Sequence, residues 1–389
     1  MTDLSIRSKG GCSMRTGILG GTFDPIHRGH VEAAKAALEA LSLDRVLVLP
    51  SGQPPYKRCH AGRQARLDMV KLACDGEKGL VPCDIEINRD GESYTVDTLK
   101  ALRRLCPEDE FTYIIGADAL NSLPKWRGLD EIAQMTSFAV LSRPGWDRQS
   151  AEAQAALPGV NVTFTDIEGL PISSGMARTR VAAGEDVSEL VGKDVAEYIR
   201  SHGLYLCDYT EPEILEKLKK ALTVHRYYHT LGVADTAERL SERFGVDSHR
   251  ARLAGLLHDC AKSMPYGEMR RIVSENVPDT DEQELDSEPV LHAPAGMVVA
   301  QRDYGVRDRA ILQAIRRHTL GGEDMTAMDA LIYVSDFIEP GRRPFPGLED
   351  VRALAEVDIF AAMRACARLT TDYVTSRGQK SHPKTMALL

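Results

Sequence analysis

The sequence has no long apolar run and no clustered cysteines, and these absences argue against several classes of protein. No stretch of the 389 residues approaches the roughly 20 apolar residues that cross a bilayer, and residues 1–13 lack the apolar core of a secretion signal. The eight cysteines form no Cys-x-x-Cys pair, which argues against a zinc ribbon or a disulfide framework. A net charge of −9 disfavours general nucleic-acid binding. We expect a soluble, cytoplasmic protein with reduced thiols that binds neither membranes nor nucleic acids.

The length and the change of pattern along the chain indicate two domains. With 389 residues, 43% of them hydrophobic, the chain can bury two cores. Strand signals occur in the first half but nearly vanish after a helix that ends around Gly203, a natural helix stop. We expect an α/β domain with a parallel sheet over residues 1–207 and an all-α helical bundle over residues 208–389.

Residues 20–30, Gly-Gly-Thr-Phe-Asp-Pro-Ile-His-Arg-Gly-His, are the most informative segment of the chain. They follow an apolar run, 16–19, that suits a buried strand, and precede an alanine-rich run, 31–38, that suits a helix. Gly20 and Gly21 permit backbone torsions closed to other residues, and they let a ligand approach the main chain closely. The pattern predicts a strand, a turn and a helix around a bound group.

Two histidines, His27 and His30, stand three residues apart at the start of this helix. At this spacing they can point the same way, and free N–H groups at a helix start favour an anion. They can therefore donate hydrogen bonds to phosphate oxygens as charge develops in a transition state. Such a pair alone is more often two surface or capping residues, but the Gly-Gly-Thr-Phe-Asp-Pro lead favours a phosphate site.

The segment resembles the signature of the His-x-Gly-His nucleotidyltransferases, in particular the bacterial nicotinate-mononucleotide adenylyltransferases. Other motifs of that family are similar to residues 54–57, 93–99, 116–120 with Trp126, 141–145 and 172–178. The resemblance covers about residues 15–207 and implies a Rossmann-like fold. It implies that this domain transfers AMP from ATP, with Mg²⁺, to nicotinate mononucleotide, giving deamido-NAD and pyrophosphate.

The resemblance also assigns residues to the substrates. Those expected to bind ATP are Gly20, Gly21, Thr22, Phe23, His27, His30, Asp118, Ser173, Ser174 and Arg178. Those expected to bind the mononucleotide are Lys57, Thr95, Trp126 and Arg143. His27, His30 and Arg178 would be catalytic through charge neutralisation on the phosphates. The chain departs from the family pattern with Tyr56 for a histidine, Gly175 for a threonine and Ala177 for an isoleucine. Outside the family context, Trp126 is typical of a partly buried core aromatic and Ser173-Ser174 of a capped surface helix.

In the second half, residues of metal-ligand type stand inside apolar stretches: His229, His258, Asp259, His292, His318 and Asp336. Burying a carboxylate such as Asp336 in an apolar helix is costly unless a cation coordinates it. Each histidine alone is more often a satisfied core residue, but the set together favours a metal centre. Histidine and carboxylate ligands suit iron, manganese or zinc.

The order His, His-Asp, Asp resembles the HD-domain phosphohydrolases. Segments similar to the bacterial HD-type symmetrical diadenosine tetraphosphate hydrolases are 225–234, 257–262, 291–292, 315–319, 335–342 and 381–385. The resemblance implies hydrolysis of diadenosine tetraphosphate to two ADP at a dinuclear metal site, with iron as first choice and manganese as second. His292 and His318 would complete the second metal position. Lys262, Arg316 and Arg342 would contact phosphate, with Lys262 also catalytic, although such cations are also common as plain surface charges.

Alternatives stay open for both halves. The first domain is otherwise an adenylyltransferase with another acceptor, such as a pantetheine phosphate or an alcohol phosphate, and the second a nucleotide sensor or scaffold. We expect Cys260 in the core, since the helix turns it about 100° from its neighbour, and the acidic stretch 279–286 to be a solvated loop. Either Met14 is the native start or residues 1–13 are a disordered leader. Homo-oligomerisation is left open.

Overall fold

The computed structural model describes residues 13–120, 122–142 and 159–389, which belong to two compact units. The first unit runs to Leu204 except for residues 182–185, and the second takes that short segment and resumes at Tyr205. The expected domain boundary after residue 207 falls just beyond this division. The predictions about the leader concern mostly residues 1–12, which lie outside the described part.

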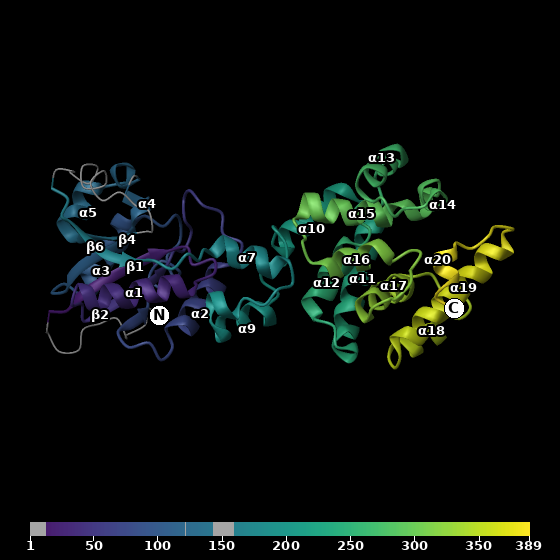
Figure 1. Ribbon diagram of the computed structural model, residues 1–389, viewed down its shortest axis with the longest axis horizontal. Helices are drawn as coiled ribbons and strands as arrows, with labels where there is room; N and C mark the ends of the chain where they lie inside the picture. The colour runs from purple at the N-terminus through teal and green to yellow at the C-terminus, as the bar shows by residue number, and fades with distance from the viewer. Residues whose placement is uncertain (1–12, 121, 143–158) are drawn as a thin grey trace. The chain divides into compact units, whose positions relative to one another are not determined.

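A six-stranded parallel sheet forms the centre of the first unit (Figure 1). Its strands lie in the order β3-β2-β1-β4-β5-β6, and each neighbouring pair runs parallel. They are β1 (Arg15–Gly21), β2 (Arg45–Pro50), β3 (Leu80–Pro82), β4 (Glu110–Gly116), β5 (Ser137–Ser142) and β6 (Val162–Glu168). The winding direction reverses between β1 and β4, and in open α/β sheets ligands bind at the carboxyl ends of the strands at such a point. The predicted parallel α/β fold is confirmed.

The helices of this unit connect and cover the strands. They are α1 (Arg28–Ala40), α2 (Arg63–Cys74), α3 (Thr95–Leu105), α4 (Ala117–Leu120), α5 (Leu129–Met135), α7 (Ser174–Ala182), α8 (Ser188–Val191) and α9 (Lys193–Ser201), with the 3-10 turn η2 (Leu123–Lys125). Every residue of β2 is buried, as expected for a strand whose sheet is covered on both faces. Strand β5 likewise contains four consecutive apolar residues rather than an alternation of apolar and polar ones.

Every regular element of the second unit between Tyr205 and Leu389 is helical, as predicted. The elements are α10 (Glu211–Ala221), α11 (Val224–Ser241), η3 (Glu242–Phe244), α12 (Ser248–Leu257), α13 (Tyr266–Asn276), α14 (Glu282–Leu285), α15 (Glu288–Tyr304), α16 (Arg309–Arg317), α17 (Ala327–Ile338), α18 (Leu348–Ala355), α19 (Ile359–Ser376) and α20 (Pro383–Met386). Helix α11 packs against α12 and α17, and α16 against α15 and α17. Cys260 is buried in this core, as expected. Among the described residues, no helix is both long and apolar enough to cross a membrane.

The acidic stretch 279–286 is only in part the predicted solvated loop: most of its residues are exposed, but it contains one helical turn and one buried carboxylate. Its residues 282–285 form α14, and Glu284 is fully buried. The Glu284 carboxylate pairs with the guanidinium of Arg316 and with Lys384 Nζ at 2.6 Å. His382 Nε2 lies 3.2 Å from a carboxylate oxygen of Asp281. Basic partners from distant segments compensate these charges, which a count of acidic residues along the sequence does not reveal.

Candidate functional site

The turn between β1 and α1 brings the two predicted histidines together. His27 is the residue before the first turn of α1. The backbone N–H of His27 donates a hydrogen bond to Nδ1 of His30 at 3.2 Å. The two rings stack with their centroids 3.6 Å apart and their planes 20° apart. Both imidazoles therefore stand at the amino end of α1, where backbone N–H groups favour an anion.

Gly20 and Gly21 are required for space rather than for unusual torsions. Both belong to β1, and neither is among the described residues with a positive φ; in this turn that conformation belongs to Phe23, at 47°. A Cβ atom on Gly20 would overlap the hydroxyl of Tyr113, and one on Gly21 would lie 3.1 Å from the Phe23 ring. The torsions that glycine permits are therefore not used at these two positions, where neighbouring side chains approach the main chain closely.

The second predicted phosphate motif packs directly against the first. Ser173 precedes α7, and its hydroxyl accepts a hydrogen bond from the N–H of Met176 at 3.1 Å. The hydroxyl of Ser174 donates to the carbonyl of Pro25 at 2.8 Å, and Nη1 of Arg178 donates to the carbonyl of Asp24 at 2.7 Å. Segments about 150 residues apart in the sequence thus form one site, with the amino ends of α1 and α7 both contributing.

A buried arginine that the sequence analysis missed organises the neighbouring loops. The guanidinium of Arg66, on α2, is 1% exposed and donates to the carbonyls of Thr22, Ser51 and Gly52 at 2.8, 2.6 and 2.9 Å. Its rigid planar fork presents five N–H donors in fixed directions, whereas the ammonium group of a lysine has three and no fixed fork. Arg66 therefore fixes the ends of β1 and β2 relative to each other.

Lys57 lies at the edge of the same turn. Its Nζ atom donates to the hydroxyl of Thr22 at 3.3 Å, which places a positive charge beside the phosphate motif. The carboxylate of Asp24 accepts hydrogen bonds from the backbone N–H groups of His60 and Ala61 at 2.7 and 3.0 Å. This carboxylate therefore ties the loop that carries Lys57 to the histidine turn.

Two of the four residues predicted to bind the mononucleotide, Thr95 and Trp126, contact the same tyrosine, Tyr113. The ring of Trp126 meets Tyr113 edge to face, with centroids 5.7 Å apart, and the side chain of Thr95 forms a hydrogen bond with the same tyrosine. Burial raises the pKa of Tyr113, so its hydroxyl stays protonated. Trp126 packs on the core while partly exposed. The side chain of Asp118 and all of Arg143 lie outside the described part of the structure.

In the second unit, all six residues of metal-ligand type come together. They sit on or at the ends of five different helices: His229 on α11, His258 and Asp259 after α12, His292 on α15, His318 after α16 and Asp336 on α17. Two groups have their ligand atoms within 4.8 Å of one another: His229, His258 and Asp336, and His258, Asp259 and His318. Every member of both groups is among the six residues predicted from the sequence as metal ligands.

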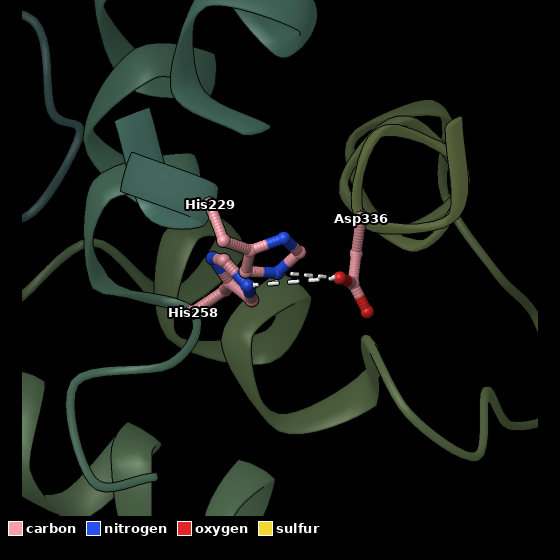
Figure 2. Close-up of side chains that lie close together, drawn as sticks. All are labelled: His229, His258 and Asp336. Carbon is pink, nitrogen blue, oxygen red and sulfur yellow. Dashed lines mark ion pairs between the residues drawn. The ribbon is translucent and has the colours of Figure 1, made fainter. Parts of the chain in front are cut away.

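Figure 2 shows how the first group is arranged, with both imidazoles directed at one carboxylate. Nε2 of His229 lies 3.0 Å from Oδ1 of Asp336, and Nε2 of His258 lies 3.9 Å from the same oxygen. Both Nε2 atoms are buried and have no hydrogen-bond partner of acceptable geometry among the described residues. Two buried imidazole nitrogens directed at one carboxylate oxygen are a donor set that fits a metal cation well.

Asp259 lies between the first group and the remaining histidines. Its Oδ2 atom is 3.8 Å from Nε2 of His229 and 3.6 Å from Nε2 of His258. Its Oδ1 atom is 3.0 Å from Nε2 of His292 and 3.7 Å from Nε2 of His318. One oxygen therefore faces each set of imidazoles, an arrangement that suits a carboxylate bridging two cations.

The backbone fixes which nitrogen His258 and His318 present to the centre. Nδ1 of His258 lies 2.7 Å from the carbonyl of Gly255, and Nδ1 of His318 lies 2.7 Å from the carbonyl of Ile315. Since a carbonyl only accepts, Nδ1 carries the proton and Nε2 is left with its lone pair. Burial lowers the pKa of His258 and of His292 to about 4, which keeps these rings neutral as metal ligands require.

Two arginines compensate the carboxylates of this centre. Nη2 of Arg342, a predicted phosphate contact, lies 2.6 Å from Oδ1 of Asp336. Nη1 of Arg226 lies 2.9 Å from Oδ2 of Asp259, and this residue was missed although it stands three positions before His229. Arginines in the first turn of a helix are common on protein surfaces, so the sequence pattern does not indicate that Arg226 contacts the metal-type residues.

The other two predicted phosphate contacts differ in their placement. Lys262 lies at the site, with Nζ 3.0 Å from Nδ1 of His292, and burial lowers its pKa. Arg316 instead pairs with the buried Glu284 and donates to Thr280 at 3.4 Å. Arg316 thus shares the Glu284 carboxylate with Lys384, and its contact with a substrate phosphate stays a prediction.

Comparisons with known proteins divide at the same place as the fold. The family model described as cytidylyltransferase-like matches residues 18–180, and the HD domain model matches residues 226–363. A protein of Shouchella clausii named "Probable nicotinate-nucleotide adenylyltransferase" is 41% identical over 194 residues, which are 49% of this chain and 96% of that protein. A protein of Bacillus subtilis named "Bis(5'-nucleosyl)-tetraphosphatase, symmetrical" is 45% identical over 175 residues, 44% of this chain and 92% of that protein.

One similar protein spans both units. A Mycoplasma genitalium protein named "Probable nicotinate-nucleotide adenylyltransferase/Ap4A hydrolase" is 27% identical over 327 residues. The match covers 84% of this chain and 87% of that protein. The same two parts therefore occur joined in a second chain.

Proposed function

We propose one reaction for each part of the chain, because the chain belongs to the family that joins a nicotinate-nucleotide adenylyltransferase to an HD-domain symmetrical tetraphosphatase. The protein is thus an enzyme. Residues 1–207 transfer AMP from ATP to nicotinate mononucleotide, releasing deamido-NAD and pyrophosphate. Residues 208–389 hydrolyse diadenosine tetraphosphate to two ADP. A cytoplasmic location is part of the proposal.

The first reaction is supported chiefly by the union of the two phosphate motifs. His27 and His30 stand at the amino end of α1, and Ser174 and Arg178 are held against the same turn. In our proposal ATP binds as its Mg²⁺ complex, the histidines contact the α- and β-phosphates, and Ser174 and Arg178 hold the departing pyrophosphate. Transfer of this kind needs no covalent intermediate, so alignment and charge neutralisation supply the catalysis.

The acceptor is proposed to lie against the wall formed by Thr95, Tyr113 and Trp126. An aromatic ring that is partly exposed can pack against the pyridine ring of nicotinate mononucleotide. Lys57 is proposed to approach the mononucleotide phosphate from the other side of the turn. Asp118 and Arg143 stay predictions in this scheme.

The second reaction is supported chiefly by the position of Asp259 between two sets of imidazoles. His229, His258 and Asp336 would hold one divalent cation and His292 and His318 the other, with Asp259 shared. Iron is our first choice and manganese the second. When bound, such ions stabilise the charge of a phosphoryl transition state. Lys262, with Arg226 and Arg342, would attract the tetraphosphate chain.

Two single variants of the full-length chain test both assignments at once. His27→Ala should abolish pyrophosphate release from ATP and nicotinate mononucleotide while leaving diadenosine tetraphosphate hydrolysis intact. His258→Ala should do the reverse, with ADP as the product that disappears. Each variant thus serves as the folding control for the other unit. His249→Ala, a histidine of α12 outside the metal set, should retain both activities.

The alternatives give different results in the same assays. Faster turnover with phosphopantetheine than with nicotinate mononucleotide would replace the first reaction by another adenylyl transfer. A protein that binds Fe²⁺ or Mn²⁺ yet leaves diadenosine tetraphosphate intact would make the second unit a nucleotide sensor or scaffold.

A further inference from the structure

We propose that Glu339 is a positioning residue for His229 and thereby strengthens the metal position formed by His229, His258 and Asp336. This inference rests on the proposed metal centre. Glu339 lies just beyond the end of α17, and only 4% of its surface is exposed. This carboxylate has no role in either proposed reaction. Burying a charged group is costly unless it has partners.

The carboxylate is held by two groups. Oε1 of Glu339 lies 3.1 Å from Nδ1 of His229, and the N–H of Gly341 donates to Oε2 at 2.5 Å. A carboxylate at neutral pH only accepts, so Nδ1 of His229 carries the proton and Nε2 is left free for a metal ion. Nε2 is the atom that faces Asp336 at 3.0 Å.

Helix α11 leaves room for this contact. Gly232 lies three residues after His229, and a Cβ atom there would stand 2.7 Å from Oε2 of Glu339. Any larger residue at this position would therefore push the carboxylate away from the histidine. Arg352 adds a second restraint, since it donates to the carbonyls of Ile338 and Glu339, each at 3.1 Å.

His229 differs in this respect from two other histidines of the centre. Nδ1 of His258 and Nδ1 of His318 face neutral backbone carbonyls, whereas Nδ1 of His229 faces a full negative charge. A carboxylate raises the basicity of the imidazole and fixes its orientation, and losing such a partner typically costs 10–100-fold in metal affinity. The position containing His229 has this added negative charge, whereas Nδ1 of His318 in the other position faces a neutral carbonyl, so we expect the position containing His229 to bind its cation more tightly.

Mn²⁺ binding to the chelator-stripped, full-length protein tests this inference by titration calorimetry. Glu339→Gln keeps an acceptor of the same length but removes the charge, so we expect roughly 10-fold weaker binding at the tighter position and no change at the other. Glu275→Gln is the matched control, because that exposed carboxylate of α13 pairs with Arg271 one turn away on the same helix. It should bind Mn²⁺ as the unaltered protein does.

The outcomes separate this inference from the proposed function. Failure of the unaltered protein to bind Mn²⁺ would remove the metal centre itself. Normal binding by the unaltered protein together with unchanged affinities in Glu339→Gln would overturn the role of Glu339 alone. Thermal melting of the metal-free variants checks folding. If Glu339→Gln does not fold, Glu339→Asp keeps the charge but shortens the reach to His229, and unchanged affinity there would overturn the inference as well.

Discussion

Arg178 donates a hydrogen bond to the carbonyl oxygen of Asp24 across 2.7 Å, which joins a residue of α7 to the turn in front of α1. The contact uses one of the five N–H groups of the guanidinium and leaves others to face a ligand. A single side chain can therefore align the turn and hold a phosphate at the same time.

Replacing this side chain by lysine should separate the two tasks. Arg178→Lys keeps the charge but not the planar fork, so we expect kcat for adenylyl transfer to fall by about 100-fold, as for loss of one aligned donor. Steady-state pyrophosphate release measures the effect. Arg180→Lys, an exposed neighbour on α7, should leave kcat unchanged, and equal losses in the two variants would contradict the role given to Arg178.

The tight contact at Gly20 predicts a compensating pair. Gly20→Ala places a methyl group against the hydroxyl of Tyr113, and overpacking of this kind costs about 1–3 kcal/mol. Tyr113→Phe removes that hydroxyl and leaves the ring carbon 3.2 Å away. Thermal unfolding of the double variant should recover much of the loss seen in Gly20→Ala. Strictly additive losses would show that the strain lies elsewhere.

The buried Glu284 predicts a large effect from removing one charge. Glu284→Gln leaves the guanidinium of Arg316 and the ammonium of Lys384 without their buried carboxylate, and breaking such a pair costs about 3–5 kcal/mol. Denaturant unfolding of the second unit measures the change. The same substitution at Glu275, which forms an exposed pair with Arg271, should cost about 0.5 kcal/mol or less.

Removing the metal should affect one thermal transition only. A cation held at 100 times its dissociation constant stabilises the folded state by about 2.7 kcal/mol, which corresponds to a shift in Tm of roughly 5–10 °C for a unit of this size. Calorimetry with and without chelator should show that shift in the helical unit alone. His258→Ala identifies the transition, since its Tm should no longer respond to chelator. A shift of both transitions would place a metal in the first unit as well.

Much of the fold followed from local pattern. The apolar run 16–19 and the alanine-rich run 31–38 lie inside β1 and α1, because each has the periodicity of a single element. The six metal-type residues were also found, since polar residues inside apolar helices stand out in a sequence. Both predictions rest on local sequence patterns and do not depend on which distant segments contact each other in the fold.

The residues that the sequence did not indicate are recognised only by contacts between segments that are distant in the sequence. Arg66 is recognised only by the three loop carbonyls around it, and Glu339 only by its distance to His229. Arg316 was expected at the phosphates, but its partner Glu284 was interpreted as part of a solvated loop. Sequence spacing indicates which residues are unusual, whereas the pairing of charges from distant segments is decided by packing.

The two units use opposite ends of the helix dipole. Helices α12 and α16 finish at His258 and His318, so their carboxyl ends adjoin the cluster of imidazoles and carboxylates. Each such end carries the equivalent of about half a negative charge. In the first unit, α1 and α7 begin at the phosphate motifs and present their positive ends. The same peptide backbone therefore favours cations in one unit and anions in the other, independently of the charged side chains.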